Sequence, residues 1–257
     1  MDDVIISKAI TQSFTDEFMN YLDVDVAIAG AGPSGLTAGY YLARKGIKTV
    51  IYERKLSIGG GMWGGGMMFN RIVVQDEARP ILDEMGVATV EYEPGYYVAD
   101  AVATVSALGY QCIKAGARIF NLVSVEDVMI REDDRVAGLV LNWSAVGMAN
   151  LHVDPLSMKS RFVIDATGHD AEVCRIVARK IGARLNTSTG EVVGEKPMWA
   201  EHGERDLVAK VGEVYPGLLA SGMAVNAVYG YPRMGPIFGG MLISGKQVAE
   251  LTAELLK

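Results

Sequence analysis

Residues 24–35 read Val-Asp-Val-Ala-Ile-Ala-Gly-Ala-Gly-Pro-Ser-Gly, and this stretch decides the fold of the 257-residue chain. Its first half is an apolar run rich in β-branched residues, which predicts a buried strand over residues 24–29. The residues that follow, 36–43, predict a helix. The glycines between the two elements have the G-x-G-x-x-G spacing of a dinucleotide-binding turn.

Each glycine of this turn has a separate physical task. Gly30 allows the tight turn, Gly32 lets the backbone approach a pyrophosphate, and Gly35 lets the helix and the strand pack closely. Ser34 lies inside the same motif, where the first-turn amides and the helix dipole favour a phosphate group. We therefore expect these four residues to bind a cofactor or nucleotide.

A second apolar strand, residues 49–52, ends at Glu53. A carboxylate at this point is placed to accept hydrogen bonds from ribose hydroxyls. A glycine-rich turn alone is weak support for nucleotide binding, and the alternative is a purely structural βαβ turn. Strand, glycines, helix, second strand and acid in this order favour binding of a dinucleotide or of adenosine diphosphate.

The composition excludes several classes of protein. Hydrophobic residues make up 50% of the chain and charged residues only 21%, so a large core can form. The net charge of −7 argues against a nucleic acid as the main partner. Apolar stretches are too short for a membrane span, and the acidic start of the chain is unlike a signal peptide.

The two cysteines, Cys112 and Cys174, lack the spacing of a metal site and indicate a reducing compartment. Both lie in apolar helical contexts, so we expect buried thiols in a cytoplasmic protein.

The rest of the chain predicts one α/β domain over residues 1–257, with residues 1–22 as a helical segment before it. We expect that segment either to cap the domain or to contact another subunit. The remaining elements are helices over residues 76–86, 97–115 and 171–181, strands within residues 117–130, 136–143 and 161–169, and an ordered polar loop over residues 186–204.

A glycine cluster occupies residues 58–69, with six glycines in eight residues. Such a backbone is costly to order as a regular helix or strand, and it usually lies against a ligand. We expect a ligand cradle that includes Gly61, and the alternative is a flexible surface loop. Interleaved large apolar residues weigh against that alternative, because they would be poorly soluble if exposed; they are Trp63, Met67, Met68 and Phe69.

The order of these elements resembles the two-dinucleotide-binding-domain flavoprotein superfamily. Glu53-Arg54 matches the residues that close the second strand there, and the resemblance implies that both bind the cofactor. The resemblance implies an α/β, Rossmann-like fold with a mostly parallel central sheet and an additional small β element. Three later motifs are similar to those of the thiamine thiazole synthases, specifically the archaeal type that uses sulfide. They are His152-Val153-Asp154-Pro155, Ala166-Thr167-Gly168-His169-Asp170 and Arg233-Met234-Gly235-Pro236.

This resemblance implies that NAD is a substrate. The family removes nicotinamide from NAD, condenses the ADP-ribose with glycine, adds sulfur, and forms ADP-5-ethyl-4-methylthiazole-2-carboxylate. Eukaryotic members take the sulfur from their own cysteine in a C-x-D-P motif and are spent after one turnover. His152 stands at that position here. The resemblance therefore implies a multiple-turnover enzyme that takes free sulfide.

The resemblance also assigns site residues. Asp154 and His169 match the family's Fe(II) ligands, which come from neighbouring subunits if the enzyme is a homo-oligomer, an octamer by resemblance. His152 is either a proton shuttle or a structural residue. Arg233 matches the anchor of the glycine carboxylate.

Other matches concern the nucleotide. Val125 is expected to offer backbone hydrogen bonds to adenine, Met223 to line the nucleotide, and the helix start within residues 239–249 to face the pyrophosphate.

Three other readings remain open from the sequence. An FAD-dependent oxidoreductase shares the glycine fingerprint and Glu53, but it needs a substrate domain that this length barely permits. A non-catalytic relative would bind NAD without consuming it. A sugar-phosphate isomerase is the third, since the bound ADP-ribose must itself be isomerised.

Overall fold

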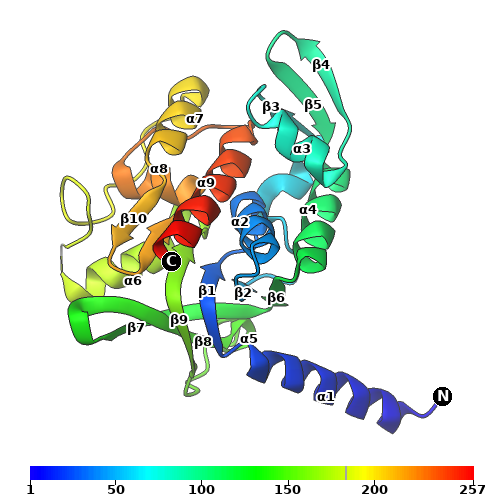
Figure 1. Ribbon diagram of the computed structural model, residues 1–257, viewed down its shortest axis with the longest axis vertical. Helices are drawn as coiled ribbons and strands as arrows, with labels where there is room; N and C mark the ends of the chain where they lie inside the picture. Colours follow the sequence, from blue (N-terminus) through cyan, green and yellow to red (C-terminus); the bar gives the residue numbers. More distant parts are fainter. Residues whose placement is uncertain (183) are drawn as a thin grey trace.

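The computed structural model describes residues 1–182 and 184–257. Its centre is a parallel sheet in which the apolar strand β1 (Asp23–Ala29) lies between two buried neighbours, β2 (Thr49–Glu53) and β9 (Leu156–Asp165). The strand order is β10-β11-β9-β1-β2-β6, and β7 and β8 extend the sheet through an antiparallel pairing of β8 with β9 (Figure 1). The Rossmann-like fold with a mostly parallel sheet is confirmed.

The other helices and strands connect and cover these three strands. In chain order they are α1 (Asp3–Asn20), α2 (Pro33–Arg44), η1 (Gly60–Gly64), β3 (Arg71–Val74), α3 (Arg79–Met85), β4 (Thr89–Glu93), β5 (Tyr96–Asp100), α4 (Ala101–Ala115), β6 (Arg118–Asn121), β7 (Val123–Arg131), η2 (Glu132–Asp134), β8 (Arg135–Trp143), α5 (Ser144–Met148), η3 (Gly168–Asp170), α6 (Glu172–Ile181), α7 (Ala200–Ala209), β10 (Gly212–Tyr215), β11 (Leu218–Ala220), α8 (Met223–Tyr229) and α9 (Gly239–Leu255).

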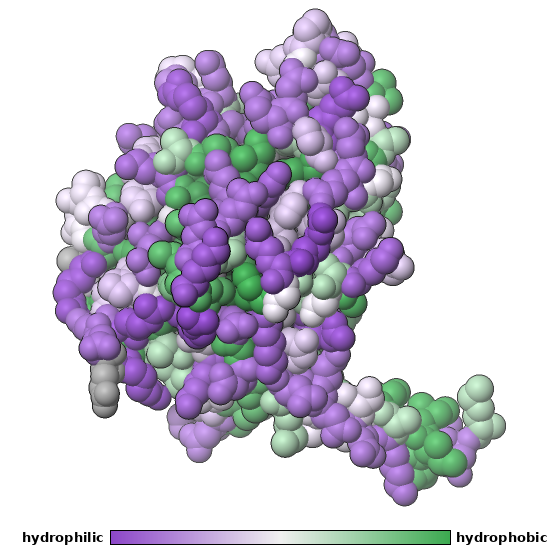
Figure 2. Space-filling view, in the orientation of Figure 1, coloured by the Kyte–Doolittle hydropathy of each residue, from purple (hydrophilic) through white to green (hydrophobic). Residues whose placement is uncertain are grey.

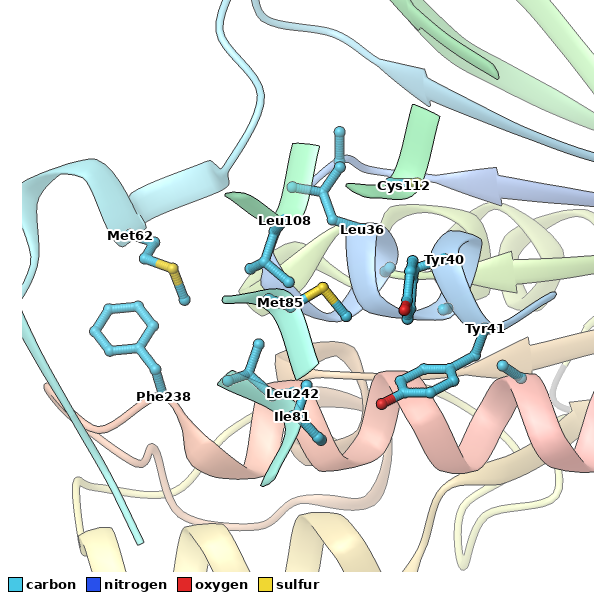
Figure 3. Packing of buried hydrophobic residues seen from close by; sticks show 14 of the residues in the cluster. Leu36, Tyr40, Tyr41, Met62, Ile81, Met85, Leu108, Cys112, Phe238 and Leu242 are labelled. Carbon is cyan, nitrogen blue, oxygen red and sulfur yellow. The ribbon is translucent and has the colours of Figure 1, made fainter. Parts of the chain in front are cut away.

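Two apolar cores hold this arrangement together. One joins α2, α4 and α9, and its centre includes the fully buried side chains of Leu36, Leu108 and Leu242 (Figure 3). The other packs α6 and α8 against β7, β8 and β9. Burying a leucine side chain of this kind contributes about 1.5–3 kcal/mol. The ends of β1, β2 and β9 are therefore fixed from both faces, which matters for the site described below.

The segment 97–115 differs from the sequence prediction. The helix α4 begins only at Ala101, and the preceding residues form β5, the middle strand of a small antiparallel sheet with the order β3-β5-β4. Asp100 ends the strand and caps the helix, since its Oδ1 accepts a hydrogen bond of 2.9 Å from the N–H of Ala103. This sheet is the additional small β element that the fold class included.

The segment 186–204, predicted as a loop, is helical from Ala200 onward because α7 begins there. The predicted helix near the N-terminus is confirmed as α1, which projects from the body of the molecule (Figure 1). Only its last turns pack on the domain, where the rings of Phe18 and Phe120 pack edge to face. Among the described residues, no helix combines the length and the apolar character needed to cross a bilayer.

Candidate functional site

A cavity of about 580 Å³ opens at the carboxyl ends of β1, β2 and β9. Its size is that of a typical small-molecule site, and the carboxyl edge of a parallel sheet is where α/β proteins bind ligands. The cavity gathers ten residues that the sequence predicted for the site: Gly30, Gly32, Ser34, Glu53, Arg54, Gly61, Val125, His169, Met223 and Arg233.

The glycine turn has the geometry that its motif predicts. Gly30 has φ +98°, and a Cβ there would lie 2.5 Å from the carbonyl oxygen of Ala166. A Cβ on Gly35 would lie 2.0 Å from the carbonyl oxygen of Gly30. Gly32 differs, because a Cβ there would meet nothing within 4 Å while the residue itself lines the cavity. Gly30 and Gly35 therefore serve the fold, and the space beside Gly32 is left for a ligand.

The glycine cluster lies directly beside the glycine turn and lines the cavity next to it, since the N–H of Gly59 donates to the carbonyl of Ala31 at 2.7 Å. Gly60, Gly61 and Gly65 line it, and both Gly60 and Gly65 have φ +57°. A Cβ on Gly65 would meet the carbonyl oxygens of its own turn, the nearer at 2.1 Å. These positions agree with the expected cradle beside a cavity, and the alternative of a flexible surface loop is not needed to explain these glycines.

The argument from large apolar residues in this cluster is wrong for most of them. Met67, Met68 and Phe69 are 77%, 94% and 69% exposed, and Trp63 is 37% exposed. Met62, a residue of the cluster that the prediction did not name, is buried instead, and it packs beside Phe238 in the α2–α4–α9 core (Figure 3).

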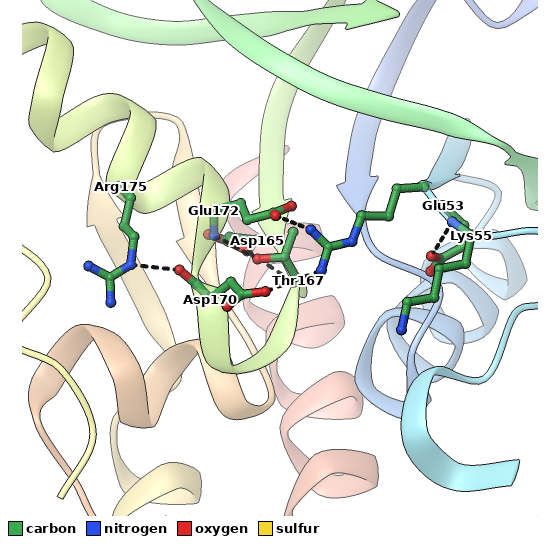
Figure 4. A network of polar contacts seen from close by, with 8 residues as sticks. Glu53, Lys55, Asp165, Thr167, Asp170, Glu172 and Arg175 are labelled. Carbon is green, nitrogen blue, oxygen red and sulfur yellow. Dashed lines mark hydrogen bonds and ion pairs between the residues drawn. The ribbon is translucent and has the colours of Figure 1, made fainter. Parts of the chain in front are cut away.

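Glu53 lines the cavity at the end of β2 and is almost fully buried. Its carboxylate accepts backbone N–H bonds from Ala31 (2.9 Å) and Lys55 (2.8 Å), so it is rigidly placed (Figure 4). Each carboxylate oxygen still has a free lone pair, because an ionised carboxylate can accept about four hydrogen bonds. Glu53 can therefore accept from ribose hydroxyls, as predicted.

Arg54 is held by two acids that also line the cavity. Its guanidinium pairs with Glu172 and, at 3.2 Å, with Asp170 (Figure 4). Burial raises the pKa of Glu172, an effect that the positive charge of Arg54 opposes. The arginine charge is thus largely neutralised inside the protein.

Val125 lies at an irregular point of β7. Its pairing with β8 shifts register between Val125 and Asp127, which is the signature of a β-bulge. The extra residue is Glu126, and a bulge leaves backbone groups of that residue unpaired beside Val125. Ser34 is buried, and its hydroxyl lies 2.5 Å from that of Ser221, in the turn that carries Met223.

His169 lies in a turn that a buried acid shapes. Asp165, at the end of β9, is fully buried and accepts hydrogen bonds from the Thr167 N–H and hydroxyl (3.0 and 2.7 Å; Figure 4). It also accepts one from the Cys174 N–H (2.9 Å). These bonds tie the strand end to the start of α6. The short η3 between them presents His169 to the cavity.

His169 and Arg233, 64 positions apart in the chain, meet at a third residue, Glu195. The Nδ1 atom of His169 lies 2.7 and 2.9 Å from the two carboxylate oxygens of Glu195. The Nε atom of Arg233 lies 3.9 Å from the same carboxylate. Sequence reasoning missed Glu195, since it lies in a polar segment without periodicity or motif.

Asp154 and His152 do not join this group within one subunit. Both precede β9, whereas His169 follows it, and a ten-residue strand spans about 33 Å. Neither lines the cavity. In the part of the chain that the structure describes, no three His, Cys, Asp or Glu side chains are grouped as metal ligands would be. An imidazole and a carboxylate suit Fe(II) as donors, but of the predicted pair, Asp154 and His169, one subunit brings only His169 to the cavity.

The start of α9 borders the cavity, which Phe238 and Met241 line, and the expectation that this helix end faces the pyrophosphate stays a prediction. The N–H of Gly240 donates to the carboxylate of Glu204 at 2.5 Å, and Gln75 donates to the same oxygen at 2.8 Å. Burial raises the pKa of Glu204. A first-turn amide of α9 is therefore occupied by a side chain.

Comparison with known proteins gives a consistent result. Residues 7–238 match the model of the Thi4 family. The chain is 60% identical to a thiamine thiazole synthase of Methanothermobacter thermautotrophicus, over 100% of this chain and 99% of that protein. It is 51% identical to a thiamine thiazole synthase of Pyrococcus horikoshii, over 99% and 98%. A solved structure of THI4 from Thermovibrio ammonificans superposes with a TM-score of 0.98 at 54% identity, covering 100% and 99%.

Proposed function

The chain belongs to the Thi4 family and is an enzyme of thiazole synthesis for thiamine, and we propose that its substrates are NAD, glycine and free sulfide. The product is ADP-5-ethyl-4-methylthiazole-2-carboxylate, with release of nicotinamide. The observation that carries this proposal is the single cavity in which a nucleotide-binding turn, an imidazole and a guanidinium meet.

Binding of NAD follows from the cavity walls. The space beside Gly32 admits a pyrophosphate, and Glu53 stands where ribose hydroxyls would lie. The first-turn amides of α2, which begins at Pro33, offer donors and the positive end of a helix dipole.

The need for free sulfide follows from the two cysteines. Cys112 and Cys174 are both fully buried, and neither lines the cavity (Figure 3 shows Cys112). Burial raises the pKa of Cys112 to about 12 and that of Cys174 well above its ordinary value. Such thiols are poor nucleophiles and poor sulfur donors. With His152 at the donor position, the sulfur must come from outside the protein, which permits many turnovers in the reducing cytoplasm.

Glycine and the metal fit the other end of the cavity. The guanidinium of Arg233 is 57% exposed and can bind a carboxylate through paired donors. His169 supplies one Fe(II) ligand, and Asp154 supplies the other from a neighbouring subunit. Fe(II) would supply a Lewis acid and a coordination position for hydrosulfide. His152 lies beside Asp154 in the sequence, so it would reach the same shared site.

An oligomer of this kind is supported by the exposed apolar surface around Asp154. Leu151 is 61% and Val153 48% exposed on either side of His152, and Met148 is 86% exposed. The projecting helix α1 exposes a further apolar face, visible in Figure 2, with Ile5 65% and Ile10 66% exposed. Apolar patches of this extent mark protein–protein contacts.

The decisive experiment is an anaerobic incubation with NAD, glycine, Fe(II) and sulfide, followed over time by mass spectrometry. More than one equivalent of the ADP-thiazole per subunit is the expected result. Intact NAD, or a flavin bound to the isolated protein, would instead support the oxidoreductase reading. NAD bound but not consumed would point to the non-catalytic relative.

The shared metal site has its own test. Asp154→Ala and His169→Ala should each abolish product formation and leave NAD affinity within about tenfold. Subunits of the two inactive variants, dissociated and mixed, should regain part of the activity, because some sites then contain both ligands. Two inactive variants that stay inactive after subunit exchange would contradict a site built from two subunits.

A further inference from the structure

The side chain of Glu195 is directed at His169 from outside the cavity wall. Both of its carboxylate oxygens lie within 2.9 Å of Nδ1, and the glutamate side chain is only 15% exposed, whereas the imidazole is 50% exposed. His169 lines the cavity and Glu195 does not. The carboxylate therefore contacts the ring from a position that does not line the cavity.

The backbone holds Glu195 in this position. The N–H of Gly194 donates to the carbonyl of Ala227 at 2.8 Å, and the N–H of Lys196 donates to that of Tyr231 at 3.0 Å. The N–H of Arg233 donates back to the carbonyl of Lys196 at 3.2 Å. Glu195 is thus fixed by its neighbours on both sides, on a strand-like segment that runs beside the one carrying Arg233.

This contact determines the tautomer of the imidazole. An ionised carboxylate can only accept hydrogen bonds, so Nδ1 carries a proton, and in the neutral imidazole Nε2 then carries the lone pair. Nε2 has no hydrogen-bond partner within the described residues, and it is the nitrogen remote from Glu195. A histidine that binds a metal commonly has its other nitrogen bonded to a carboxylate in this way.

We propose that Glu195 is a positioning residue that fixes His169 in the Nδ1–H tautomer and turns Nε2 toward the cavity. The metal-binding part of this inference rests on the proposed function, but the tautomer does not. The same carboxylate lies 3.9 Å from the Nε of Arg233, which leaves the two terminal NH₂ groups of the guanidinium for a carboxylate ligand. One side chain thus sets the positions of the groups for metal and for glycine.

The test compares the wild type with Glu195→Ala and with Glu191→Gln. Glu191 is an exposed glutamate in the same polar segment, and its substitution is the matched control. The first readout is the solid-state ¹⁵N spectrum of metal-free protein labelled at histidine, at a pH where imidazole is neutral. His169 is identified by the signals missing from His169→Gln. The second readout is the affinity for Co(II), measured by its visible absorption.

We expect a protonated Nδ1 in the wild type and in the control, and a mixture or the opposite tautomer in Glu195→Ala. The Co(II) affinity of Glu195→Ala should fall about 10–100-fold, while NAD affinity is unchanged. An unchanged His169 spectrum in Glu195→Ala overturns the proposal. If the wild type binds no Co(II), the metal assignment fails, and the metal-free spectra still decide the role of Glu195.

A second variant guards against a folding defect. Glu195→Gln keeps the shape of the side chain and one acceptor oxygen, but it lacks the charge that strengthens the hydrogen bond. Its Co(II) affinity should lie between those of the wild type and Glu195→Ala. Equal affinities for wild type and both variants would contradict a positioning role.

Discussion

Substitution of Gly32 by alanine separates nucleotide binding from folding. Gly32 has φ −74° and ψ −177°, which alanine adopts without strain, and a Cβ there would meet no protein atom within 4 Å. Replacing a glycine at such a position leaves stability unchanged or raises it by about 0.4–1 kcal/mol through the unfolded state. The free energy of unfolding of Gly32→Ala should therefore be at or slightly above that of the wild type.

NAD binding should respond in the opposite direction. The added methyl group occupies the space in which the proposed pyrophosphate meets the turn, and overpacking of this kind costs about 1–3 kcal/mol. At about 1.4 kcal/mol for each factor of ten, the dissociation constant for NAD should rise roughly 5–150-fold. Titration calorimetry measures this change, and thermal unfolding without NAD measures the stability.

Two further glycines provide the controls. A Cβ on Gly35 would lie 2.0 Å from a backbone oxygen, so Gly35→Ala should lose at least about 1–3 kcal/mol of stability. Gly212 is outside the cavity with no atom near its Cβ position, so Gly212→Ala should leave NAD affinity unchanged and leave stability unchanged or slightly raised, as in Gly32→Ala. Wild-type NAD affinity in Gly32→Ala would refute the reasoning and favour a purely structural βαβ turn.

Three other changes have defined outcomes. Cys112→Ala combined with Cys174→Ala should retain sulfide-dependent product formation, measured by mass spectrometry; loss of product from folded protein would point to a cysteine as sulfur donor. Arg233→Ala should raise the KM for glycine while NAD affinity stays the same, and an unchanged glycine dependence would remove its proposed role. Burial raises the pKa of Glu204, so its contribution to stability is complete below its ordinary pKa and is lost as pH rises through the raised value. The melting temperature of Glu204→Gln, relative to that of the wild type, should therefore rise from acidic to neutral pH. A difference in melting temperature that does not change with pH would contradict this prediction.

The parts of the fold that the sequence predicted are those set by local rules. The strand at residues 24–29 and the helix after it depend on composition and on glycines within a dozen residues. The boundary at Ala101 was missed because apolar residues continue from Val98 into the helix, so the pattern alone shows no break. The signal that marks the break is Asp100, whose side chain caps α4.

The candidate site was predictable only in part for a different reason. Motifs identified His169 and Arg233 separately, but their connection through Glu195 depends on a contact across 26 residues in one direction and 38 in the other. The segment that carries Glu195 has no periodicity, since backbone bonds to residues 227–233 hold it rather than an apolar face. The placement of Asp154 at the far end of β9 follows from the sheet and not from its spacing to His169.

The charges around the cavity explain how an acidic chain can hold an anionic nucleotide. Arg54 is neutralised by Asp170 and Glu172, and Arg233 is partly balanced by Glu195. The proposed pyrophosphate therefore depends mainly on backbone N–H groups and on the dipole of α2, which are fixed and cannot be withdrawn into ion pairs. The free donors of Arg233 remain for a small carboxylate at the other end. In the proposed function, recognition of phosphate by the backbone is thus separate from recognition of glycine by a side chain.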